Sequence, residues 1–128
     1  MGSYGEAAFK AVKLHTSGKA KSPSDAWEKA TIKMFGQGTS SQKKGCPRNA
    51  FLGLCEEGLV KGIPPGNYTR SKKNKEYAIK AVKILQGAPE LSFNSKTLWN
   101  KVIKGGQKVH NQQMDIVIAL WNNNLIEG

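Results

Sequence analysis

A nine-residue segment near the start of the chain recurs 70 residues later, and this repeat constrains the fold more than any other feature. The segment that begins at Glu6 has the sequence EAAFKAVKL, and the segment that begins at Glu76 has the sequence EYAIKAVKI. Six of the nine positions are identical, and two of the differences exchange one apolar residue for another. Self-similar segments indicate a repeated supersecondary unit. The pattern therefore predicts that one structural unit occurs twice.

Two further pairs of segments support this interpretation. Residues 52–62 have the sequence LGLCEEGLVKG, and residues 118–128 have the sequence IALWNNNLIEG, at an offset of 66. The segment WEKA, which begins at Trp27, matches WNKV, which begins at Trp99. The three pairs occur in the same order along the chain. Because both tryptophans recur between the units, we expect them to be core residues.

The length of the chain fits two small units packed together. A unit of about 60 residues is only marginally able to bury a core by itself. The chain has 128 residues, so two such units would form one globular body. We expect a first unit in residues 1–62, a basic connecting segment in residues 63–75 and a second unit in residues 76–128.

Each unit contains the start and stop signals of three short helices. Ser22 and Pro23 give an N-cap followed by a proline in the first turn, and Gly36 ends that helix. The third helix is expected to start at Pro47. In the second unit the first helix is expected to start at about Lys75, and Asn94 or Ser95 caps the next one. Gly58 follows the third helix, where a left-handed C-cap is expected, and Asn124 holds the same place in the second unit. The predicted fold is all-α, with about six short helices in two tandem helix-turn-helix-like units. A short extended piece or wing between the units is part of this prediction.

The charge of the chain is strongly positive. It carries 20 Lys and Arg against 9 Asp and Glu, a formal net charge of +11. Such a surface attracts polyanions such as nucleic acid, anionic lipid or an acidic protein. The basic residues gather before and within the third helix of the first unit, and in the connecting segment. The residues expected to contact nucleic acid are Lys43, Lys44, Arg48, Asn49, Arg70, Lys72, Lys73, Lys75, Lys108, Asn111 and Gln112.

The order of the helices makes DNA the first candidate partner, ahead of RNA. In a helix-turn-helix unit the third helix enters the major groove and its first turn contacts base edges. Arg48 and Asn49 would lie on that turn, and these residue types pair with guanine and adenine. One feature departs from the motif. The gap from Gly36 to Cys46 spans eleven residues, against the 3–4 of a standard turn.

Other interpretations stay open. The connecting segment GIPPGNYTRSKKNK is either a solvated linker or a phosphate-contacting wing. Tyr68 either stacks on an exposed base or packs its ring between the units. The alternative function is a protein-interaction or accessory module whose charge serves solubility or an acidic partner, and an exposed apolar patch would favour it. Binding to a membrane surface ranks third, because no helix joins a basic face to a strong apolar one.

The sequence offers no motif of an enzyme or of a cofactor site. It contains no Walker A loop, no G-x-S-x-G elbow and no H-E-x-x-H zinc motif. Glu56 and Glu57 are interpreted as surface charge, because neighbours in a helix do not face each other. Cys46 has basic neighbours that favour a thiolate, but we interpret it as a buried or capping residue. We therefore expect no catalytic residue, no cofactor and no metal.

A family resemblance covers the middle of the chain. The stretch GCPRNAFLGLCEEGLVKGIPPGNYT, followed by NKEYAIKAVKIL, resembles a small bacterial family catalogued only as a domain of unknown function. The resemblance implies a bacterial, cytoplasmic protein and supplies no activity, substrate or catalytic residue. The chain also has no run of about 18 apolar residues that could span a membrane.

Overall fold

The computed structural model describes residues 3–104, 106, 110 and 112–127, and within them the fold is all-helical. The helices are α1 (Ser3–Thr16), α2 (Pro23–Phe35), α3 (Ser40–Lys43), α4 (Gly45–Glu56), α5 (Lys72–Gly87), the 3₁₀ helix η1 (Pro89–Phe93), α6 (Ser95–Val102) and α7 (Gln113–Asn122). In this part of the chain six α-helices have eight residues or more, and α3 is a single turn. The predicted all-α class with about six short helices is confirmed.

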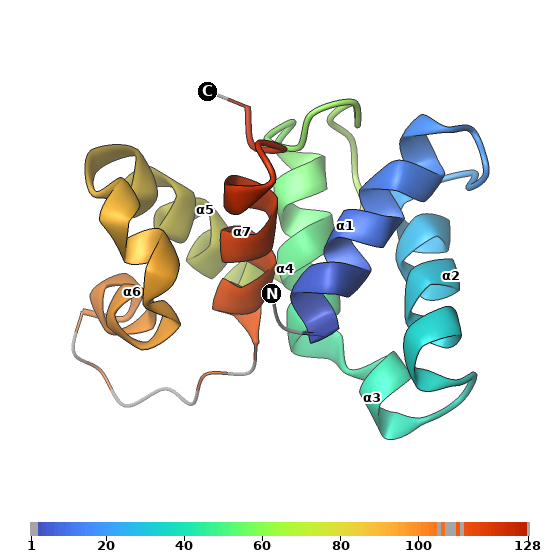
Figure 1. Cartoon of the computed structure of the whole chain (residues 1–128), viewed down its shortest axis with the longest axis horizontal. Helices are drawn as coiled ribbons and strands as arrows, with labels where there is room; N and C mark the ends of the chain where they lie inside the picture. Colours follow the sequence, from blue (N-terminus) through green and yellow to red (C-terminus); the bar gives the residue numbers. More distant parts are fainter. Residues whose placement is uncertain (1–2, 105, 107–109, 111, 128) are drawn as a thin grey trace.

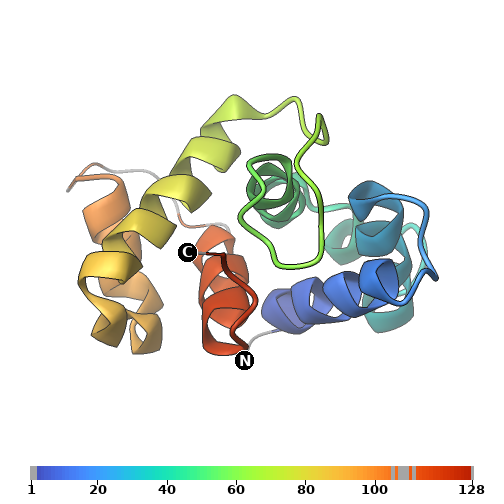
Figure 2. The ribbon, with the colours of Figure 1, turned by 90° about the horizontal axis from the view of Figure 1, so that it is seen from above.

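The helices are arranged around a central pair. Helices α4 and α7 lie side by side in the middle, the antiparallel pair α1–α2 covers one side, and α5 and α6 cover the other (Figure 1). Helix α1 packs on α7, and α5 packs on α4. The first helix of each predicted unit therefore packs on the third helix of the other. Figure 2 shows the same arrangement of the helices from above.

The two central helices end in the same way. Gly58 follows α4 with φ 76°, and Asn124 follows α7 with φ 60°. Both conformations are left-handed, which glycine adopts freely and asparagine tolerates. After these residues the chain is extended, and Val60 and Ile126 form an isolated antiparallel β-bridge. The predicted C-caps and the extended piece after the third helix are thus observed.

The core contains both repeated tryptophans. Trp27 of α2 stacks on Phe51 of α4 with 5.3 Å between ring centroids. Trp99 of α6 contacts Tyr77 of α5 edge to face at 5.1 Å. Both tryptophans are buried, as expected. Six consecutive residues of α4, from Ala50 to Cys55, are also buried, so this half of α4 is covered on all sides.

Local capping signals place several helix starts. The Oγ of Ser22 accepts a hydrogen bond from the backbone amide of Asp25 at 3.0 Å, and the Oδ1 of Asn94 accepts one from Thr97 at 3.0 Å. Both N-caps match the sequence. Thr39 caps α3 in the same way, at 3.2 Å, within a stretch where the sequence suggested only a long connection.

Two helices begin earlier than the sequence suggests. Helix α4 begins at Gly45, where Pro47 was expected to open it. Proline in a first helical turn removes no hydrogen bond, so it does not mark the exact start. Helix α5 begins at Lys72, where the sequence placed its start near Lys75. Residues 63–71 contain no strand, so the connecting segment forms neither a hairpin nor a wing.

Candidate nucleic-acid interface

The carboxylate of Glu56 holds the connecting segment against α4. Its Oε1 accepts hydrogen bonds from the backbone amides of Tyr68 at 2.7 Å and Thr69 at 3.2 Å. Its Oε2 accepts one from the Nζ of Lys75 at 2.6 Å. The Lys75 ammonium, followed by the Tyr68 amide, lowers the pKa of Glu56 to about 2. The interpretation of Glu56 as plain surface charge is wrong, because this side chain is only 11% exposed and makes tertiary contacts.

Lys75 forms ion pairs with both acidic residues at the end of α4. Its Nζ also lies 2.9 Å from the Oε1 of Glu57, and its side chain is 20% exposed. The two carboxylates raise the pKa of this lysine, the Glu56 hydrogen bond most strongly. The ammonium is thus engaged with these two carboxylates, and its expected contact with phosphate stays a prediction.

Tyr68 packs within the turn of the connecting segment. Its hydroxyl donates a hydrogen bond to the carbonyl of Pro64 at 2.6 Å, and its ring is partly buried against the core. A Cβ on Gly66 would lie 2.8 Å from this ring, so a side chain at that position would displace the ring. These contacts favour a packed ring of Tyr68 over a ring that is free to stack on a base.

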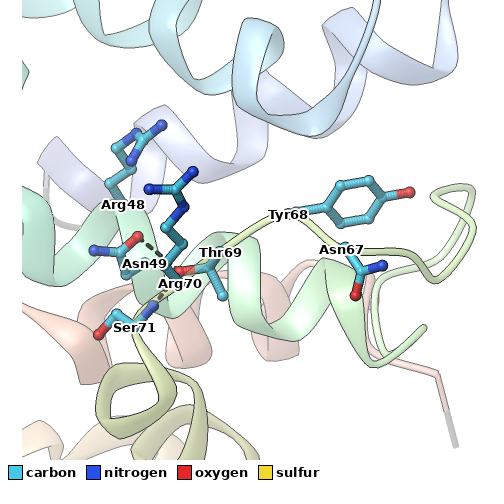
Figure 3. A pocket seen from close by; sticks show the side chains of 7 residues that line it. All are labelled: Arg48, Asn49, Asn67, Tyr68, Thr69, Arg70 and Ser71. Carbon is cyan, nitrogen blue, oxygen red and sulfur yellow. Dashed lines mark hydrogen bonds between the residues drawn. The ribbon is translucent and has the colours of Figure 1, made fainter.

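A hollow of about 640 Å³ lies between the start of α4 and the end of the connecting segment (Figure 3). Its lining residues are Arg48, Asn49, Asn67, Tyr68, Thr69, Arg70 and Ser71. Every charged residue in this lining is an arginine. The guanidinium groups of Arg48 and Arg70 point to the same side of the hollow in Figure 3. The fold thus brings together residues of the two basic clusters that are about twenty positions apart in sequence.

Hydrogen bonds fix the polar wall of this hollow. The Oγ1 of Thr69 donates to the Oδ1 of Asn49 at 2.8 Å and accepts from the backbone amide of Ser71 at 3.1 Å. An Nη2 group of Arg48 donates to the Oγ of Ser24 in α2 at 3.1 Å. The guanidinium of Arg48 keeps further donors beyond this one bond. The wall is therefore held in place while donors remain for an anion.

The start of α5 adds positive charge next to the hollow. Ser71 is the N-cap of α5 and makes no side-chain capping hydrogen bond. Lys72 and Lys73 lie on the first turn and are exposed, as is Arg70. The first amides of a helix have no intrahelical partner and carry the positive end of the helix dipole. Anions are stabilised at such a place.

Lys43, Lys44 and Gln112 are not among the residues that line this hollow. The Nζ of Lys44 donates a hydrogen bond to the Oε1 of Gln112, which places these two side chains from different units together. The same ammonium is 6.0 Å from the ring centroid of Tyr4. Lys43 is exposed at the end of α3. Lys108 and Asn111 lie outside the residues that the structure describes.

The burial of α4 restricts how it can meet DNA. A recognition helix presents an exposed face to the major groove. Residues Ala50 to Cys55 of α4 are buried, and α7 packs against it. Only the first turn of α4, with Arg48 and Asn49, is at the surface, and both of these side chains are hydrogen-bonded to neighbours. Insertion of α4 along a groove is therefore incompatible with the fold.

The cysteines and histidines do not assemble into a site. Cys55 is fully buried, and burial raises the pKa of its thiol. The Nε2 of His110 accepts a hydrogen bond from the backbone amide of Met114 at 3.1 Å, at the start of α7. Within the described ranges no three His, Cys, Asp or Glu residues are grouped so that they could hold a metal ion. No helix in those ranges is long and apolar enough to cross a membrane.

One family model matches residues 1–127, and its description is "Family of unknown function (DUF6979)". The chain belongs to this family. The match confirms the resemblance to a domain of unknown function and extends it over nearly the whole sequence. No curated protein and no solved structure matches the chain. A function for this DUF6979 member is therefore inferred from the chemistry of its own residues.

Proposed function

We propose that this protein binds nucleic acid through the sugar-phosphate backbone, at the hollow beside the starts of α4 and α5. The observation that carries the proposal is the pairing of Arg48 and Arg70 around one polar hollow. Arginine presents a planar fork of donors that matches phosphate geometry. Lys72 and Lys73 extend the same positive surface along α5.

The expected mode is contact with phosphates and not readout of bases. The exposed face of α4 is limited to its first turn, where Asn49 is engaged with Thr69. Phosphate contacts position a protein on a duplex and carry no sequence information. We therefore expect similar affinity for unrelated duplexes, with duplex DNA as the first ligand to test.

The salt dependence of DNA binding tests this proposal. A labelled random-sequence duplex is titrated at several salt concentrations, with anisotropy as the readout. Four cations that each neutralise one phosphate give a slope of about −3.6 in a plot of log K against log salt. The variant Arg48→Glu/Arg70→Glu should bind weakly and give a slope nearer to about −1.8.

A charge-matched variant separates a localised site from general attraction. Lys10→Glu/Lys13→Glu on α1 changes the net charge by the same amount, away from this hollow. We expect this control to keep most of the affinity. Equal losses in both double variants, or no binding of the wild type at low salt, would remove the proposal.

A further inference from the structure

A second hollow, also of about 640 Å³, lies on the antiparallel pair α1–α2. Its lining residues are Phe9, Lys10, Lys13, Leu14, Thr16, Ser17, Lys19, Ala30 and Lys33. None of them lines the hollow beside α4. Every charged residue in this lining is a lysine, whereas the charged residues that line the first hollow are both arginines. The two sites therefore differ in both place and chemistry.

The floor of this groove is apolar. Phe9 and Leu14 are partly buried against the core and still present apolar surface, and Ala30 is buried beneath them. The ammonium of Lys13 lies 5.3 Å from the ring centroid of Phe9, so its hydrocarbon stem lies over apolar surface. Such a lysine can move its charge to an incoming carboxylate while its stem stays in contact with the floor.

The two hydroxyl groups at the end of the groove donate to nearby backbone carbonyls. The Oγ1 of Thr16 donates to the carbonyl of Lys13 at 3.4 Å, and the Oγ of Ser17 donates to the carbonyl of Leu14 at 3.2 Å. These hydroxyls turn back to their own helix. The groove therefore offers a partner an apolar floor and four ammonium groups.

We propose that the α1–α2 groove docks an acidic amphipathic helix from a protein partner. Apolar side chains at helical spacing would lie on Phe9 and Leu14. Asp and Glu on both flanks of the partner helix would meet Lys10 and Lys13 on α1 and Lys33 on α2. An amphipathic helix lying in a groove is a recurrent mode of peptide recognition, in which residues at i, i+3 or i+4 and i+7 are the anchors.

The chemistry of the groove favours this occupant over other anions. Four lysines on three segments exceed what the single carboxylate of a fatty acid requires. A nucleic acid would place its phosphates on lysines but would leave the apolar floor uncovered. An acidic helix satisfies the floor and the charges together, since interfaces combine an apolar centre with complementary charge at the rim.

The repeat supplies a matched control for the test. The positions of Lys10 and Lys13 correspond to Lys80 and Lys83 in the second copy of the repeated segment. The variant Lys80→Glu/Lys83→Glu therefore makes the same change of charge at the same places of an equivalent helix. Of these two lysine pairs, only Lys10 and Lys13 line the α1–α2 groove.

The probe is a fluorescein-labelled 16-residue peptide with leucines at helical spacing and glutamates on both flanks. A second peptide of the same composition has its leucines scrambled out of that spacing. We expect the wild-type protein to bind the amphipathic peptide about tenfold more tightly than the scrambled one. Lys10→Glu/Lys13→Glu should weaken that binding about tenfold or more, since it replaces attraction by repulsion at two rim positions.

The controls decide between this groove and general electrostatics. Lys80→Glu/Lys83→Glu and Arg48→Glu/Arg70→Glu should each change peptide affinity by less than about threefold. Circular dichroism establishes that every variant is folded. Equal binding of both peptides, equal losses in all three variants, or binding to anionic phosphatidylglycerol vesicles but not to the amphipathic peptide would overturn the proposal. Failure of DNA binding alone would leave it standing, because the two sites share no residue.

Discussion

The backbone amide of Lys61 donates a hydrogen bond to the carbonyl of Leu125 with an N···O distance of 2.8 Å. The amide of Glu127 donates to the carbonyl of Leu59 at the same distance. Each bond maps onto the other when 66 residues are added or subtracted, which is the offset of the matching segments 52–62 and 118–128. The repeated segments are thus partners in one local two-fold arrangement.

The two left-handed C-caps should respond differently to substitution. Asn124→Gly should leave the free energy of unfolding nearly unchanged or raise it slightly, because glycine adopts φ 60° without strain. Gly58→Ala should lower it by about 1–2 kcal/mol, since a Cβ is disfavoured at φ 76°. Urea unfolding of both variants measures this. A cost at Asn124→Gly as large as that at Gly58→Ala would show that the asparagine side chain, not the backbone conformation, is what matters.

Gly53 should be the glycine whose replacement costs most in α4. A Cβ at this position would lie 2.7 Å from the Cα and Cβ of Lys75, at the contact between α4 and α5. Because a backbone atom cannot move as a side chain does, Gly53→Ala should lower the free energy of unfolding by about 2–3 kcal/mol.

A second helical glycine provides the control for this prediction. A Cβ on Gly87, in the last turn of α5, would meet nothing within 4 Å. Gly87→Ala should therefore be neutral or mildly stabilising, by up to about 0.5 kcal/mol at a helix end. Equal effects of Gly53→Ala and Gly87→Ala in urea unfolding would contradict the tight contact with Lys75.

The sequence predicted those features that depend on neighbouring residues. Ser22 and Asn94 cap their helices, and Gly58 and Asn124 close theirs, because each signal acts within a few residues. The repeat also predicted the two buried tryptophans. The packing of α1 on α7 could not be predicted, since nothing in a helical periodicity says which unit supplies the partner helix.

In the candidate site, too, the sequence predicted local features but not tertiary contacts. The sequence placed Arg48 and Arg70 among the residues expected to contact nucleic acid, and the fold brings them to one hollow. It missed Glu56, whose partners Tyr68 and Lys75 lie 12 and 19 positions further along. An acidic residue at a helix end looks like surface charge until tertiary structure supplies its donors. The ion pairs of Lys75 could not be predicted for the same reason.

Glu56 should make stability depend on acid pH. Its pKa in the folded state, about 2, lies below the usual 4.5, so the unfolded chain binds the proton more tightly. The contribution is present above about pH 4.5 and is lost as pH falls toward about 2. Glu56→Gln should lower the free energy of unfolding at pH 7 by about 2 kcal/mol, because a charged acceptor of three hydrogen bonds is lost.

The neighbouring carboxylate is the matched comparison for Glu56. Glu57 also contacts Lys75, but its side chain is 48% exposed. Glu57→Gln should lower the free energy of unfolding by at most about 1 kcal/mol, as is usual for exposed ion pairs. Urea unfolding between pH 2.5 and pH 7 should show a flatter profile for Glu56→Gln than for Glu57→Gln. Profiles of the same steepness would argue against Glu56 as the acid-sensitive group.

His110 should make stability depend on pH in a higher range. Its Nε2 accepts a hydrogen bond from the amide of Met114, which requires the neutral ring because a protonated imidazole has no acceptor. Burial lowers the pKa of His110, Lys44 lowers it further, and Asp115 opposes both. The contribution is present above the usual value of 6.5 and is lost as pH falls below it.

A side-chain amide at position 110 can keep the hydrogen bond at the start of α7 without titrating. The side-chain oxygen of glutamine extends to the same ε position as Nε2, can accept the same hydrogen bond and does not titrate, so His110→Gln should keep the start of α7 at all pH values. We expect wild-type stability to fall between pH 7.5 and pH 5 in urea unfolding. The variant should lose clearly less over that range. The two proteins differ only at position 110, so the difference between the two profiles reports His110, and parallel profiles would exclude it as the sensitive group.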